Sequence, residues 1–95
     1  MIASFRSKAL KRYWTTGDRA AVSATYRDKI DLLLNALDVA TKPEQMAFPG
    51  SGFHPLTGGR AGRYALTVSR NWRLTFAWDG TDAIDLDLED YHGSD

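Results

Sequence analysis

The chain contains only two histidines, His54 and His92, and each stands near other residues able to take part in acid/base chemistry. Close to the C-terminus a carboxylate, a phenol and an imidazole are consecutive, as Asp90, Tyr91 and His92. Imidazole exchanges protons near neutral pH, and a neighbouring carboxylate orients it or stabilises its charged form. The grouping therefore predicts a site that transfers protons.

The direction of these three side chains depends on the local backbone. If the last strand continues through them, Asp90 and His92 share one face and Tyr91 lies on the other. If the strand ends in a turn, all three converge. The sequence leaves both arrangements open.

Basic and acidic residues are separated along the chain, although twelve of each balance overall. Between Glu44 and Asp79 the only charged residues are arginines, and from Asp79 onward there are acids but no Lys or Arg. Such a pattern indicates either a local positive cleft for an anionic ligand or ordinary surface charge. The central arginines are Arg60, Arg63, Arg70 and Arg73.

Proton-transfer groups beside cations are what RNA cleavage requires, because a base must activate the ribose 2′-hydroxyl, an acid must protonate the leaving oxygen, and cations must stabilise the phosphorane. Arg73 lies in a run in which every second residue is apolar: Leu74, Phe76 and Trp78. We therefore expect Arg73 to point away from the core, where it can hold a phosphate. His54 precedes Pro55, which favours an extended backbone. Taken alone, each of these residues also has an ordinary structural interpretation.

Several other classes of protein are disfavoured. There is no cysteine, no helical His-x-x-x-His spacing and no Gly-x-Ser-x-Gly, so we expect no metal, no cofactor and no serine-type triad. No apolar run approaches the roughly 20 residues that span a bilayer, and the N-terminus lacks the order of a signal peptide. We therefore expect a cytoplasmic protein without a membrane partner.

The hydrophobic pattern predicts one domain, residues 1–95, of the α+β class. We expect a short N-terminal strand at 2–5, a helix at 7–14 and strands near 64–68, 72–78 and 84–88. A second helix is expected over the run Tyr26 to Leu37, with Thr25 and Asp28 placed as its N-terminal cap. Turns at Arg70–Asn71 and Asp79–Gly80 make the sheet mainly antiparallel. The two helices would pack on one sheet face and leave the other partly open.

An ordered set of short motifs resembles the HigB-type toxins of the RelE superfamily. The set includes the basic helix from Phe5 to Tyr13, His54-Pro55-Leu56, the run from Asn71 to Phe76, and the terminal Asp90-Tyr91-His92. The resemblance covers nearly the whole chain. It implies a RelE-like small domain, and a toxin that enters the A site of the 70S ribosome and cuts the bound messenger RNA.

The resemblance also implies roles and partners. His92 would be the main proton-transfer residue, supported by Asp90, with Tyr91 positioning the nucleotide, Arg73 on the phosphate and His54 assisting. The partner would be a HigA-type helix-turn-helix antitoxin, and DNA would be met only through that antitoxin. Further RNA contacts are expected from Lys8, Arg12, Arg60 and Arg63.

One departure from the family pattern concerns Thr57, because relatives often carry lysine after His-Pro-Leu. Arg60 or Arg63 is a candidate to replace the missing cation. The alternative function is a catalytically weak or inactive module that binds its antitoxin and acts as a co-repressor, with Thr57 a sign of lost activity.

Overall fold

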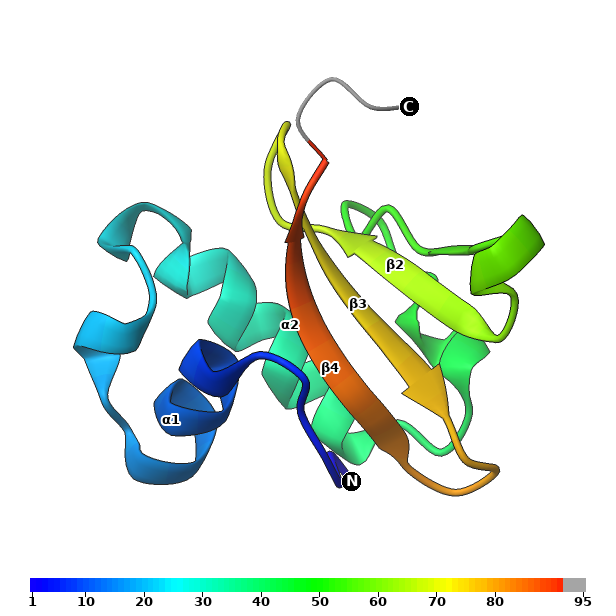
Figure 1. Cartoon of the computed structure of the whole chain (residues 1–95), viewed down its shortest axis with the longest axis horizontal. Coiled ribbons are helices and arrows are strands. Elements are labelled where there is room, and N and C mark those ends of the chain that lie inside the picture. The colour runs from blue at the N-terminus through cyan, green and yellow to red at the C-terminus, as the bar shows by residue number, and fades with distance from the viewer. Residues whose placement is uncertain (92–95) are drawn as a thin grey trace.

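The computed structural model describes residues 1–91 and shows an α+β domain, as expected: two helices packed on a four-stranded antiparallel sheet (Figure 1). The strands follow one another across the sheet in chain order. The helices are α1 (Lys8–Thr16) and α2 (Arg27–Val39), and the strands are β1 (His54–Pro55), β2 (Arg63–Thr67), β3 (Trp72–Trp78) and β4 (Ala83–Asp90). Short 3-10 turns, η1 (Arg19–Ala21), η2 (Ala24–Tyr26), η3 (Pro43–Met46) and η4 (Gly58–Arg60), connect them.

The two helices begin differently. Ser7 caps α1, because its hydroxyl accepts a hydrogen bond from the backbone N–H of Leu10 at 3.1 Å. The expectation that Thr25 caps the second helix is wrong, since Thr25 lies inside η2 and α2 starts at Arg27 without a side-chain cap. In residues 1–91 neither helix has the length and apolar character needed to cross a membrane.

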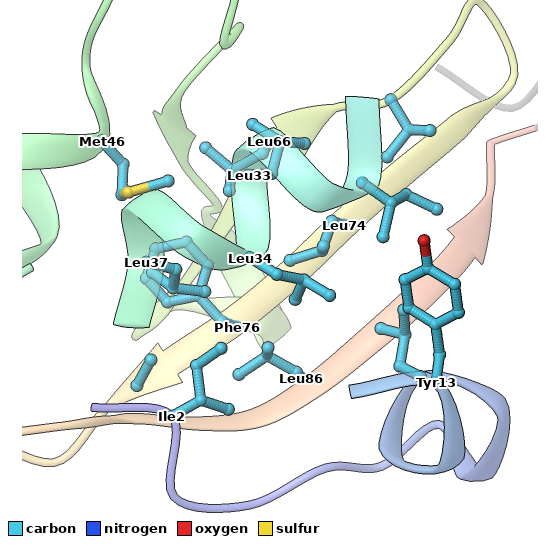
Figure 2. Packing of buried hydrophobic residues seen from close by; sticks show 14 of the residues in the cluster. Ile2, Tyr13, Leu33, Leu34, Leu37, Met46, Leu66, Leu74, Phe76 and Leu86 are labelled. Atoms are coloured by element: carbon cyan, nitrogen blue, oxygen red, sulfur yellow. The ribbon is translucent and has the colours of Figure 1, made fainter. Parts of the chain in front are cut away.

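The core lies between the helices and one face of the sheet (Figure 2). Four α2 residues at helical spacing are fully buried, and they pack with the β3 residues Leu74 and Phe76 and with Leu86 of β4. The α2 residues are Ile30, Leu33, Leu34 and Leu37. From α1, Tyr13 joins the same layer, and its hydroxyl donates a hydrogen bond to Asp31 of α2. The prediction that Leu74 and Phe76 face the core is confirmed.

The N-terminal segment runs beside β4 but does not form a full strand. Two isolated parallel bridges connect it to β4, Ile2 with Ala83 and Phe5 with Leu86. Between them a bulge in β4 places Asp85 at a φ of 52°, and the backbone N–H of Asp85 donates to the Ser4 hydroxyl at 2.9 Å instead of to a backbone carbonyl. This irregularity interrupts the strand expected at residues 2–5.

Candidate functional site

The second face of the sheet, opposite the core, carries polar residues in two rows. Directly opposed residues of antiparallel strands project to the same side. One row consists of Thr67, Arg73 and Glu89, and the next consists of His54, Ala65, Thr75 and Asp87. Arg73 and His54, predicted from distant parts of the sequence, therefore share this face.

Arg73 is held at the start of β3 by its own turn. Its Nη1 donates to the carbonyl oxygens of Ser69 at 2.7 Å, Trp72 at 3.2 Å and Arg70 at 3.3 Å. The guanidinium also lies over the ring of Tyr91, with its central carbon 5.2 Å from the ring centroid. Two predicted site residues from different strands are thus brought into contact.

The backbone around Tyr91 stays extended. Asp90 pairs with Trp72 in the β3–β4 ladder, and the N–H of Tyr91 donates to the carbonyl of Asn71 at 2.6 Å. Because Trp72 packs against the core layer, Asp90 projects toward that side and Tyr91 toward the second face. Of the two arrangements left open by the sequence, the extended one is observed up to Tyr91; His92 lies outside the described residues.

His54 is exposed at the sheet edge, in β1. Its Nδ1 lies 3.1 Å from the carbonyl oxygen of Gly52. A carbonyl only accepts hydrogen bonds, so Nδ1 carries the proton and Nε2 of the neutral ring keeps its lone pair. That tautomer leaves Nε2 available to accept a proton from a ligand.

The η4 turn reaches the second face through Arg60. Its Nη2 donates to both carboxylate oxygens of Glu89, and the Thr75 hydroxyl donates to the same carboxylate. Burial by itself raises the pKa of Glu89, but the hydrogen bonds from Thr75 and Arg60 and the Arg60 charge lower it, so the pKa lies below its ordinary value. Glu89 is therefore ionised at neutral pH.

Glu89 is the residue of this site that sequence reasoning missed. It stands within an acidic stretch, where a carboxylate is unremarkable. The available signal was its parity: Asp87, Glu89 and Tyr91 alternate with core-side residues and so face the same way as Arg73.

Arg63 occupies an interior position on the same face. It is only 8% exposed, and its Nη2 donates to the Thr75 hydroxyl at 2.8 Å and to the carbonyl of Asp85 at 2.9 Å. Within residues 1–91 its Nε and Nη1 have no hydrogen-bond partner. Burial lowers the pKa of Arg63, and the charge of Arg6 adds to this effect. The contacts give Arg63 a structural role, bridging β2, β3 and the β4 bulge.

Lys8 and Arg12 lie apart from this cluster. Both belong to α1, whose buried residues pack on the core side of the sheet. The side chain of Arg12 is exposed and forms an ion pair with Asp18 at 3.0 Å. Their expected contact with RNA stays a prediction.

The second face therefore combines two exposed or half-exposed guanidiniums, an aromatic ring, and an imidazole whose Nε2 makes no hydrogen bond to residues 1–91. Such a set binds phosphate by charge-assisted hydrogen bonds, offers a platform for a base and can move a proton. Among residues 1–91 the structure brings together no group of three His, Cys, Asp or Glu side chains able to hold a metal ion.

The chain is similar in sequence to known proteins. Residues 3–92 match the model of the family described as the RelE-like toxin of the type II toxin–antitoxin system HigB. The chain is also 40% identical over 92 residues to the protein named endoribonuclease HigB of Proteus vulgaris, a match that covers 97% of this chain and all of the relative.

Proposed function

The chain belongs to the HigB-like toxin family, the RelE-like toxins of type II toxin–antitoxin systems, and from that membership we propose that it is an endoribonuclease that cuts messenger RNA in the ribosomal A site. The observation that carries the proposal is the contact between Arg73 and Tyr91, on the sheet face that also presents His54. A cation stacked on an aromatic ring offers a phosphate contact and a base platform at one place.

The proposed reaction is an in-line transesterification. A base removes the proton of the ribose 2′-hydroxyl, whose oxygen attacks the adjacent phosphorus while the bond to the 5′-oxygen of the next nucleotide breaks. An acid protonates that leaving oxygen, so the products are a 2′,3′-cyclic phosphate and a 5′-hydroxyl end. DNA lacks the 2′-hydroxyl and cannot react in this way.

Each side chain has a proposed role in this scheme. His92 is the main proton-transfer residue with Asp90 supporting it, and His54, through Nε2, transfers the second proton. Arg73 neutralises charge that builds on the phosphate, and Tyr91 positions the nucleotide. Two imidazoles suffice for both proton transfers, so the proposed step needs no metal.

Arg60 is the proposed substitute for the cation missing at Thr57. Thr57 is exposed at the start of η4, and Arg60 lies three residues later with a side chain that is 43% exposed. Arg63, by contrast, would have to leave its buried position to touch RNA. Arg60 therefore suits direct phosphate contact better.

Membership of a toxin–antitoxin family implies an antitoxin as partner. We propose that this antitoxin is of the HigA helix-turn-helix type, that DNA is contacted only through it, and that the toxin acts in the cytoplasm, where the ribosome and messenger RNA are found. A short neighbouring reading frame that encodes a helix-turn-helix protein would support the pairing.

The test is transcriptome-wide mapping of RNA 5′ ends after brief expression in a bacterial host, comparing the wild type with His92→Ala. We expect new ends inside translated codons for the wild type and their loss in the variant, with circular dichroism confirming that both are folded. New ends spread equally over untranslated RNA would contradict ribosome dependence. Unchanged ends for a folded wild type would favour the non-catalytic, antitoxin-binding module.

A further inference from the structure

Glu89 lies beside Arg60 and Arg73 on the face proposed to bind RNA, although its negative charge would repel a polyanion. Its side chain is 21% exposed, and in β4 it is the direct cross-strand partner of Arg73 in β3. Two residues further along the chain, Tyr91 contacts Arg73. A carboxylate at this position would weaken RNA binding unless it has another role.

The contacts of Glu89 exclude a role in proton transfer. Its carboxylate accepts hydrogen bonds from Thr75 and, at both oxygens, from Arg60, and these bonds hold its pKa below the ordinary value despite burial. An ionised group with a low pKa is a poor general acid, and oxygens engaged by a guanidinium are poor bases. The remaining role is to hold Arg60.

The position of Arg60 depends on a glycine-rich turn. The turn from Thr57 to Gly62 contains three glycines, so its backbone loses much conformational entropy when it is ordered. Arg60 is 29 residues from Glu89 in sequence, and their ion pair ties this turn across the sheet to β4. Without the pair, the turn keeps fewer side-chain contacts to the sheet.

The ion pair also leaves part of the guanidinium usable. The ion pair with Glu89 uses only Nη2 of Arg60, so the guanidinium keeps further N–H groups with which it can reach Tyr91 and other acceptors. Burial lowers the pKa of Arg60, but the hydrogen bond and charge of Glu89, together with Tyr91, raise it above its ordinary value. Arg60 is thus a permanent cation placed near Tyr91.

We propose that Glu89 is a positioning residue of the nuclease, which fixes the Arg60 guanidinium beside Tyr91 so that Arg60 and Arg73 together contact phosphates of the messenger RNA. The proposal rests on the proposed function, since the phosphate groups are those of the substrate. The competing role for Glu89 is simple neutralisation, in which its carboxylate occupies the place of a phosphate and weakens RNA binding.

The two roles predict opposite changes in kcat/KM for Glu89→Gln: positioning predicts a decrease and neutralisation predicts an increase. Asp87→Asn is the matched control. Asp87 lies on the same strand and face, and within residues 1–91 its carboxylate accepts only a local hydrogen bond, from the N–H of Leu88. Removing either acid reduces repulsion of RNA by one charge. If Glu89 positions Arg60, Glu89→Gln lowers kcat/KM about tenfold on ribosome-bound message because a charge-assisted hydrogen bond is lost, whereas Asp87→Asn keeps or slightly raises it.

Exchanging the charges of Arg60 and Glu89 separates an effect on cleavage from an effect on folding stability. Arg60→Glu combined with Glu89→Arg rebuilds an ion pair between the turn and β4, so thermal stability should return toward the wild-type value. Cleavage should stay low, because the turn then presents a carboxylate to the phosphate. Full recovery of cleavage in the exchanged protein would overturn the proposal, as would a Glu89→Gln enzyme that cuts as fast as Asp87→Asn.

A third measurement does not depend on nuclease activity. The Nη2–H resonance of Arg60, the group that donates to Glu89, should be resolved by NMR and slow to exchange in the wild type and in Asp87→Asn, but averaged or fast-exchanging in Glu89→Gln. An unchanged resonance in Glu89→Gln overturns the positioning role. If the wild type cleaves no RNA at all, the proposed function fails, while this resonance still decides whether Glu89 fixes Arg60.

Discussion

The guanidinium of Arg73 lies over the ring of Tyr91, with its central carbon 5.2 Å from the ring centroid, while its Nη1 donates to the carbonyl of Ser69 at 2.7 Å. Among the described residues 1–91, the partners of Arg73 are these neutral groups and two further backbone carbonyls. A cation fixed by neutral partners keeps its charge for a ligand, unlike Arg60, which shares its charge with Glu89. The site therefore holds its two guanidiniums by different means.

Replacement of Arg73 by lysine tests whether geometry matters beyond charge. Lysine keeps the positive charge but lacks the planar fork that bonds to the turn carbonyls while stacking on Tyr91. We expect Arg73→Lys to lower single-turnover cleavage of ribosome-bound message by about tenfold or more, because one charge-assisted phosphate contact is misplaced, and to lower thermal stability slightly, because the bonds to the turn carbonyls are lost. Arg70→Lys, on the exposed turn nearby, is the control and should cleave as the wild type does. Equal rates for Arg73→Lys and Arg70→Lys would show that charge alone is enough.

The regular elements were predictable because each is governed by local periodicity. Alternation around Leu74 and Phe76 predicts both the β3 strand and its buried face, and the helical spacing from Ile30 to Leu37 predicts the face of α2 that packs on it. Strand parity predicted that Arg73 points away from the core, and the family resemblance grouped it with His54, which lies on the same sheet face. These are features in which near neighbours in sequence decide the outcome.

The features that were missed depend on contacts between distant segments. Glu89 acquires its role only because the η4 turn folds over the sheet and brings Arg60 to it. Arg63 was expected to contact RNA, but its side chain is buried, where the Thr75 hydroxyl and the Asp85 carbonyl accept its hydrogen bonds. The strand expected at residues 2–5 is interrupted by the bulge at Asp85, which alternation cannot indicate.

Gly52 is a position where any side chain should be costly. Its φ is +63°, and a Cβ there would lie 2.1 Å from the Thr67 hydroxyl oxygen and 2.8 Å from the Thr67 Cβ. We expect Gly52→Ala to reduce the free energy of unfolding by about 2–4 kcal/mol, from backbone strain and overpacking together. Chemical denaturation measures the change. Gly50→Ala is the matched control: its φ is +86° but a Cβ would meet nothing within 4 Å, so strain alone should cost about 1–2 kcal/mol. Equal losses in both variants would contradict the steric contact with Thr67.

His54 should matter for the reaction and little for folding. Its ring is exposed, and its one described hydrogen bond joins Nδ1 to the Gly52 carbonyl. We expect His54→Gln to lower the cleavage rate by about a hundredfold, because glutamine cannot transfer a proton, while the melting temperature stays within experimental error. His54→Asn, whose amide nitrogen can occupy the position of Nδ1, should keep the bond to Gly52 and be equally slow. Activity in His54→Asn would show that His54 acts by holding the loop and not by moving a proton.

Acid should destabilise the protein partly through Glu89. The folded state lowers the pKa of this carboxyl below its unfolded value, so its contribution is fully present above the unfolded pKa of about 4.3 and is lost as the pH falls through the lower, folded value. We expect Glu89→Gln to reduce the free energy of unfolding by about 1 kcal/mol at pH 7, since the ion pair with Arg60 and the Thr75 hydrogen bond are weakened, and to flatten the decline of stability below about pH 4. Urea denaturation at a series of pH values, with Asp87→Asn beside it, provides the measurement. A wild-type protein whose stability declines in acid no more steeply than that of Glu89→Gln would mean that the Arg60–Glu89 pair does not form in solution.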